Sequence, residues 1–255
     1  MLNGAVRTED SNSGPEAHRA IFATTRWSVV LAAGQRDTPQ SQAALEQLCR
    51  TYWYPLYAYV RRRGYSAEDA EDLTQGFFAR LLARQSLATV LPERGLFRCF
   101  MLAALKRFLV NDLERAGAVK RGGSKVQHVP FNGREAEERY CLDGGEQNTP
   151  DKLFDRAWAL SVMEAASWRL EEEYRLEGKD RLFERLKLFL ARNETEATYA
   201  VTGAELGLSE GAVKVAVHRM RRRYRDLLRE QVAQTVGSAA NLEDELQSLR
   251  AVFYE

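Results

Sequence analysis

Residues 201–228 read VTGAELGLSEGAVKVAVHRMRRRYRDLL and contain the most informative pattern of the chain. The pattern predicts a short helix, a turn at Gly207, an N-cap at Ser209 and a longer helix that buries Val213 and Val217. Two helices joined in this way form a helix-turn-helix. The outer face of the second helix would then meet base edges and phosphates with Glu210, Lys214, Val215, His218, Arg219 and Arg222.

The second helix of this pattern is strongly basic. From Lys214 to Arg229 there are seven Lys or Arg against Asp226 alone, a local net charge of +6, whereas the whole chain has 37 basic and 36 acidic residues and a net charge of +1. Any nucleic-acid surface is therefore local and not a uniform coat. The alternative interpretation is a solvated basic face on an ordinary pair of helices.

The rest of the chain is expected to be nearly all helical. It has 255 residues and only six prolines, and its apolar residues recur at spacings of three and four. One helix runs from Leu45 and ends before Gly64, with Pro55 expected to kink or divide it. A second begins after a cap at Ser66, and a third begins near Leu96.

The third helix carries a second basic patch. Arg98, Lys106, Arg107, Asn111 and Arg115 lie away from its apolar stripe, and Lys120, Arg121 and Lys125 follow. From Arg94 to Lys125 there are eight Lys or Arg against two acidic residues, a local net charge of +6. The alternative is a charged helix end without a ligand.

The predicted architecture is all-α, with two small helical domains joined by a flexible linker and a helix-turn-helix in the second. The boundaries are an N-terminal arm at 1–44, a first domain at 45–116, a linker at 117–150, a second domain at 151–236 and an acidic C-terminal extension at 237–255. The extension has a net charge of −3. It either shields the basic helix in cis or packs Leu242, Leu246, Leu249 and Phe253 as a helix.

Two stretches in this order resemble the extracytoplasmic-function sigma factors of bacterial RNA polymerase. Residues 71–78, EDLTQGFF, are similar to the helix with which the family binds core polymerase, and residues 208–214, LSEGAVK, with His218 and Arg219, are similar to the helix-turn-helix that reads the minus-thirty-five element. The resemblance covers about 45–121 and 153–230. It implies a sigma factor that binds core RNA polymerase and directs promoter recognition and transcription initiation.

The resemblance also implies roles for individual residues. The polymerase-binding residues would be Asp69, Asp72, Leu73, Gln75 and Phe78. The opened DNA strand near the minus-ten element would meet Arg107, Asn111, Arg115, Lys120 and Arg121. The implied partners are core RNA polymerase and promoter DNA, and members of the family often have an anti-sigma protein as well. The alternative function is a stand-alone helix-turn-helix transcriptional regulator that does not bind polymerase.

Three positions depart from the family pattern. Gly76 stands where Glu is usual, Gly203 stands where a small Ala is usual, and Ala216 stands where a long basic residue is common. The two promoter elements are about 25 base pairs apart, on the order of 85 Å. A flexible linker of the length of 117–150 reaches at most about 112 Å, which permits two separate domains to contact both.

Other chemistries have no visible residues. Cys49, Cys99 and Cys141 have no metal-ligand spacing and are expected to be reduced thiols in a cytoplasmic protein. The three histidines are scattered, and no phosphate-binding loop, dinucleotide fingerprint or nucleophile elbow occurs. The sequence therefore predicts no enzyme activity, cofactor or metal. The longest stretch without a charged residue, 232–242, is too short for a membrane span.

Overall fold

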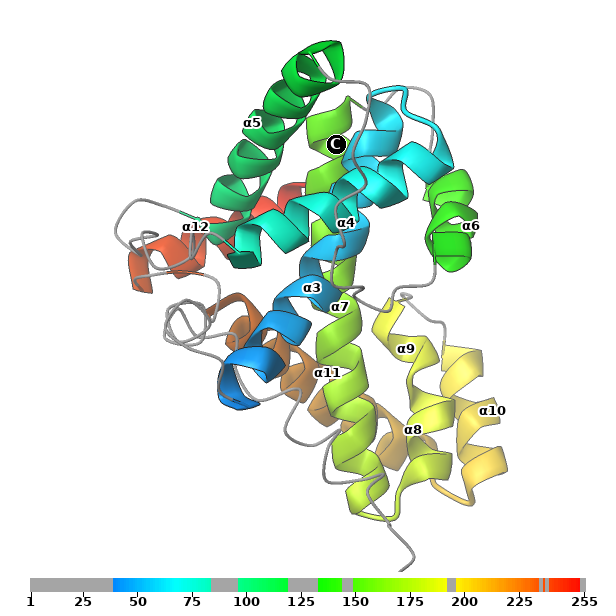
Figure 1. The fold of residues 1–255 in the computed structure, drawn as a ribbon. Coiled ribbons are helices and arrows are strands. Elements are labelled where there is room, and N and C mark those ends of the chain that lie inside the picture. Colours follow the sequence, from blue (N-terminus) through cyan, green and yellow to red (C-terminus); the bar gives the residue numbers. More distant parts are fainter. Residues whose placement is uncertain are drawn as a thin grey trace, which may run out of the picture.

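The computed structural model of the chain describes residues 39–83, 96–118, 133–143, 149–191, 196–233, 236 and 239–252. These residues form helices and contain no strand, which confirms the all-α prediction (Figure 1). In chain order the helices are α3 (Pro39–Arg62), α4 (Ala67–Ala83), α5 (Phe97–Ala118), α6 (Gly133–Asp143), α7 (Pro150–Leu176), α8 (Asp180–Leu186), α9 (Leu188–Ala191), α10 (Glu196–Leu206), α11 (Glu210–Ala233) and α12 (Ala239–Ala251).

The junction between α3 and α4 follows the sequence signals. Gly64 has a φ of +95°, a left-handed conformation that ends α3 and favours glycine. The Ser66 hydroxyl accepts a hydrogen bond from the Asp69 amide at 3.0 Å and so caps α4. Pro55 lies inside α3 and does not divide it, because the helix continues to Arg62.

The buried side chains form two clusters. The first is built on α3, whose residues 52–60 are all buried, and α4, α5 and α7 pack around it. Aromatic rings fill it, including Trp53 and Tyr57, which stack with centroids 5.2 Å apart. The second cluster joins the C-terminal half of α7 to α8, α9 and α11.

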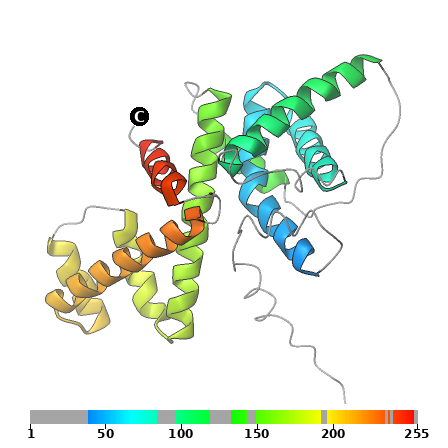
Figure 2. The same ribbon diagram turned by 90° about the vertical axis from the view of Figure 1, so that its left-hand side faces the viewer.

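Helix α7 belongs to both clusters. Its first half buries Leu153, Phe154 and Trp158 in the first cluster, and its second half buries Ala166 and Leu170 in the second. Figure 2 shows α7 as a long rod between the two groups of helices. The predicted boundary at 150 therefore falls at the start of a helix that completes the first core as well as the second.

The predicted linker is not a coil throughout. Within 117–150 the chain forms α6, which lies against α3. Arg61 and Tyr57 of α3 donate hydrogen bonds to the Glu137 carboxylate at 2.7 and 2.5 Å. The sequence has no local signal for this contact, because Glu137 and Arg61 are 76 residues apart. Residues 119–132 and 144–148 lie outside the described residues, as does most of the N-terminal arm.

The C-terminal extension packs as a helix. Leu246 and Leu249 of α12 are buried in the first cluster, and Leu242 packs against it. The packing alternative is thus observed, with Phe253 outside the described residues. One acidic side chain of this helix, Glu245, is fully buried.

Candidate nucleic-acid interface

The connection from α10 to α11 is held by short-range contacts that the sequence predicted in part. Gly207 has a φ of +67°, as a tight turn requires. The Leu208 amide donates a hydrogen bond to the Gly203 carbonyl at 2.8 Å, and the Ala212 amide donates to the Ser209 hydroxyl at 3.2 Å. Ser209 is therefore the N-cap of α11, as expected.

The inner face of α11 fixes its rotation about its own axis. Val213, Val217 and Met220 are buried in the second cluster. The Tyr224 hydroxyl donates to the Met163 carbonyl at 3.3 Å, and burial raises the pKa of Tyr224 to about 12. Arg221 donates two hydrogen bonds to the Phe189 carbonyl at 2.9 and 2.5 Å. These contacts hold the opposite face of the helix outward.

The residues predicted for base and phosphate contacts lie together on that outward face. All six are exposed, and they are Glu210, Lys214, Val215, His218, Arg219 and Arg222. Lys214 forms an ion pair with Glu210 at 2.7 Å, one turn before it. Arg219 and Arg222 form no ion pair with the part of the chain that the structure describes.

The other cations of α11 serve partly in packing. Arg223 forms an ion pair with Glu173 of α7 at 2.6 Å, and Arg229 pairs with Glu243 of α12 at 3.2 Å. The net charge of +6 predicted for this segment therefore overstates what is available to a ligand. The available charge is concentrated in the row Arg219, Arg222 and Arg225 along one side of the helix.

On α5 the structure supports part of the predicted basic patch. Arg107 and Asn111 are exposed, and the apolar side chains of Val110 and Leu113 beside them are 55% and 54% exposed. Arg115 belongs to α5, but its side chain lies outside what the structure describes, and Lys120 and Arg121 are not among the described residues.

Arg98 and Lys106 correct the prediction that this patch is wholly outward. The Arg98 side chain is 12% exposed and forms ion pairs with Asp155 of α7 and with Glu245 of α12. Lys106 pairs with Asp151 of α7. The acidic partners lie 45 to 147 residues away in the sequence, so helical periodicity within α5 gave no signal for them.

The predicted polymerase-binding residues of α4 divide into two sets. Asp69 and Asp72 are exposed, whereas Leu73 is half-buried and packs on the first cluster. Gln75 is half-buried and donates a hydrogen bond to the Glu71 carboxylate at 3.2 Å. Phe78 is 1% exposed, so the prediction that its side chain faces outward is wrong. Its position four residues after buried Thr74 places it on the inward face of α4.

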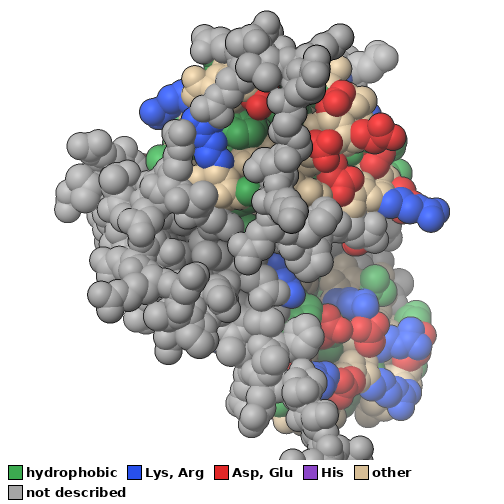
Figure 3. Space-filling model, in the orientation of Figure 1, with side chains coloured by type: hydrophobic (Ala, Val, Ile, Leu, Met, Phe, Trp, Pro, Cys, Tyr) green, Lys and Arg blue, Asp and Glu red, His purple; other side chains and the backbone are tan. Residues whose placement is uncertain are grey.

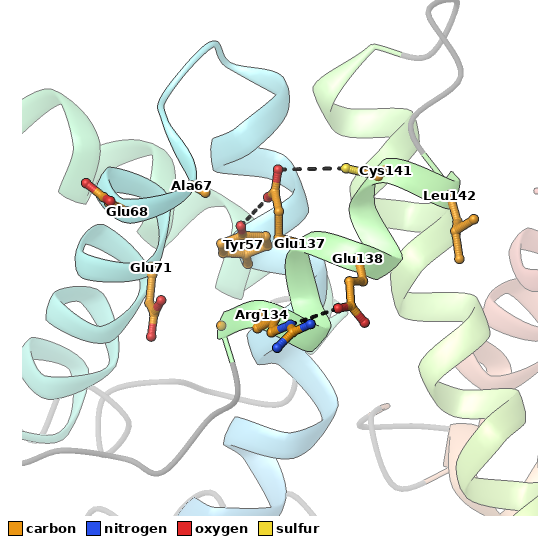
Figure 4. A pocket seen from close by; sticks show the side chains of 10 residues that line it. Tyr57, Ala67, Glu68, Glu71, Arg134, Glu137, Glu138, Cys141 and Leu142 are labelled. Carbon is orange, nitrogen blue, oxygen red and sulfur yellow. Dashed lines mark hydrogen bonds and ion pairs between the residues drawn. The ribbon is translucent and has the colours of Figure 1, made fainter.

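A cavity of about 640 Å³ lies between α4 and α6 near the exposed acidic part of α4. Figure 4 shows Glu68 and Glu71 on one side of it and Glu137, Glu138 and Cys141 on the other. Figure 3 shows acidic side chains gathered over this region. None of the residues predicted for polymerase or DNA contacts lines the cavity.

Within the described ranges, no group of three or more His, Cys, Asp or Glu side chains could hold a metal ion. The same ranges contain no helix with the length and apolar character needed to cross a bilayer. Comparisons of the chain with protein-family models, curated proteins and solved structures find no match.

Proposed function

We propose that this chain is a sigma factor of the extracytoplasmic-function type, which binds core RNA polymerase in the cytoplasm and directs transcription initiation at promoters. In this proposal α10, the turn and α11 form a helix-turn-helix that contacts the minus-thirty-five element. This motif belongs to a second helical domain, distinct from the one built on α3, α4 and α5. The protein catalyses no reaction of its own and needs no cofactor.

The observation that carries the proposal is the outer face of α11. Arg219 and Arg222 project from a helix whose inner face is locked by buried side chains, and no acidic group of the described chain neutralises them. A cation held on a rigid element without an acidic partner is available for a base edge or a phosphate. Val215, which is exposed one turn before Arg219, suits contact with a thymine methyl group.

Two further surfaces support the assignment. Asp69 and Asp72 are exposed near the N-terminal end of α4 and suit a basic partner surface. On α5, exposed Arg107 and Asn111 lie beside exposed Val110 and Leu113. Cations combined with apolar side chains suit an unpaired DNA strand, in which both phosphates and base faces are accessible.

The alternative is a stand-alone helix-turn-helix regulator. It is favoured by the sharing of α7 between the two clusters, which fixes α11 relative to α4 in the absence of a partner. Such a protein would bind duplex DNA in this arrangement without polymerase. A test for binding to core polymerase therefore distinguishes a sigma factor from a stand-alone regulator.

The first experiment therefore mixes the full chain with core RNA polymerase and follows co-migration by size-exclusion chromatography. A sigma factor co-migrates and supports transcription from a genomic-fragment library. Asp72→Ala is expected to weaken co-migration, whereas Asp244→Ala, which removes the same charge from an exposed position on α12, is not. Absence of a complex with retained duplex binding would favour the regulator.

The second experiment tests the outer face of α11. Arg222→Ala is expected to weaken binding of the reconstituted complex to its promoters by about 1–3 kcal/mol if a base contact is lost, and by less if only a phosphate contact is lost. Arg134→Ala on the exposed surface of α6 is the charge-matched control. Unchanged affinity and unchanged salt dependence for both Arg219→Ala and Arg222→Ala would remove α11 from the interface.

A further inference from the structure

Arg98 of α5 lies where α5, α7 and α12 meet. Its guanidinium donates a hydrogen bond to Glu245 at 2.7 Å and another to Asp155, and it lies 5.1 Å from the centre of the Trp158 ring. One largely buried cation thus connects α5 both to the helix shared by the two clusters and to the C-terminal helix.

Glu245 makes the attachment of α12 unusual. The residue is fully buried, yet one of its carboxylate oxygens has no hydrogen-bond partner among the described residues. Burial raises the pKa of Glu245, although the charge of Arg98 acts in the opposite direction. A buried carboxylate that is only half satisfied opposes the gain from burying Leu246 and Leu249 beside it. The attachment is therefore weaker than one made by apolar residues alone, but loss of the carboxylate would weaken it further, because the Arg98 guanidinium would stay buried without this partner.

The other side of α12 reaches α11. Glu243 forms an ion pair with Arg229 at 3.2 Å, and Val232 near the end of α11 is buried in the first cluster with Leu246 and Leu249. Helix α12 consequently contacts the end of the candidate recognition helix and the candidate strand-binding helix α5 at the same time.

We propose that α12 is a clasp, acting within the same chain, that connects the C-terminal end of the recognition helix to α5 in a closed arrangement and lowers the affinity of the protein for DNA. Its regulatory meaning rests on the function proposed above. In the closed arrangement Arg98 and Lys106 of α5 are neutralised by Asp155, Glu245 and Asp151, and Arg229 of α11 is neutralised by Glu243. Release of α12 frees the Arg229 charge and removes one of the two acidic partners of Arg98.

The test compares Glu245→Ala with Asp244→Ala in the full-length chain. Both variants lose one carboxylate from α12, but Asp244 is exposed. Hydrogen exchange of residues 239–252 is expected to accelerate by about a hundredfold in Glu245→Ala and to remain unchanged in Asp244→Ala. Exchange of α3 serves as the internal reference for intact folding of the first core.

The same variants are then titrated with random-sequence duplex DNA. Glu245→Ala is expected to bind more tightly than Asp244→Ala, and the slope of log affinity against log salt should steepen by about 0.9 for the one freed cation. Wild-type exchange rates in 239–252 for Glu245→Ala, or released α12 without tighter DNA binding, would each overturn the clasp.

If Glu245→Ala unfolds the first core, the proposal is tested on the wild-type chain instead. Saturating duplex DNA should accelerate exchange in 239–252, and unchanged or slower exchange there would overturn the proposal. None of these measurements contains polymerase. If these measurements overturn the clasp, the proposed sigma-factor function is still decided by the polymerase-binding experiment. If the chain does not bind polymerase, the effect of α12 on DNA affinity can still be measured.

Discussion

At Gly203 the backbone of α10 passes so close to the turn before α11 that a side chain has no room. A Cβ added there would lie 2.7 Å from the Leu208 carbonyl oxygen. This oxygen belongs to the backbone, and the Leu208 amide is itself hydrogen-bonded to the Gly203 carbonyl, so the obstacle does not move aside easily. The glycine that departs from the family pattern at this position has a steric reason.

Gly203→Ala is accordingly expected to lower the free energy of unfolding by about 1–3 kcal/mol, even though alanine has the higher helix propensity. Urea titration followed by circular dichroism measures the change. Gly211→Ala in the first turn of α11 is the matched control, because an added Cβ there meets nothing within 4 Å. Equal stability changes in the two variants would contradict the close approach.

Gly76 is a different case, because an added Cβ would lie 3.5 Å from the ring of Phe108, an ordinary contact distance. The residue lies in the interior of α4, where glycine carries an entropic cost. Gly76→Ala is therefore expected to raise the free energy of unfolding by about 0.5–1 kcal/mol. A higher midpoint in thermal unfolding is the measurement, and a lower midpoint would refute the argument.

At the scale of elements, Glu137 accepts hydrogen bonds that join α6 to α3, beside the contacts of Arg61 with the Tyr140 ring and of Arg139 with the Tyr54 ring. Hydrogen bonds from Arg61 and Tyr57 hold the pKa of Glu137 below its ordinary value. A carboxyl group whose pKa is lowered by folding binds its proton more weakly in the folded state. Its contribution to stability is therefore present above the unfolded pKa and is lost as the pH falls through the lower, folded value.

Glu137→Gln is expected to reduce the free energy of unfolding by about 1–3 kcal/mol at neutral pH. The difference from the wild-type chain should shrink as the pH falls from the ordinary carboxyl pKa, about 4.3, through the lower value that Glu137 has in the folded chain. Urea titrations at neutral and acidic pH measure this difference in the free energy of unfolding. Glu138→Gln, whose ion pair with Arg134 is largely exposed, should show little loss at either pH, and a pH-independent loss in Glu137→Gln would contradict the assignment.

Local signals predicted the helical elements well. Gly64, Ser66, Gly207 and Ser209 mark helix ends that the structure has, because caps and left-handed turns are determined by a few neighbouring residues. Of the two outcomes predicted at Pro55, division of the helix is excluded, because α3 runs unbroken from Pro39 to Arg62 with Pro55 in a fully buried segment.

The candidate surfaces were predicted less well, because availability depends on distant partners. Arg98 and Phe78 were assigned outward roles, yet one is paired with residues 57 and 147 positions away and the other is buried in the first core. The exposed face of α11 was predicted correctly because its buried Val213 and Val217 repeat with the helical period. Periodicity gives the direction of a side chain but not the element that covers it.

At the scale of the whole molecule, the main constraint on the proposed function is the distance that the chain can span between its two candidate DNA-binding surfaces. Helix α7 has 27 residues. At its usual rise it is about 40 Å long. The two promoter elements are separated by about twice that distance, on the order of 85 Å. A sigma factor with this arrangement therefore has to release the first half of α7 from α3 when it engages both elements.

Spin labels on exposed Glu68→Cys of α4 and Ala204→Cys of α10 can follow this release. The background replaces exposed Cys99 and Cys141 by serine. Pulsed dipolar spectroscopy is expected to give a single short distance in the unbound chain and a clearly longer one after core polymerase is added. An unchanged distance in a polymerase complex that initiates transcription would contradict the release.

Helix α7 also makes the two halves depend on each other for solubility. A chain that stops before Pro150 would lack Leu153, Phe154 and Trp158 and would leave the aromatic side chains of α3 exposed to water. The complementary fragment would carry those same three apolar groups on its first three turns without anything to cover them. Each fragment alone is therefore an aggregation hazard, and the polypeptide has to be synthesised past this helix before either half is complete.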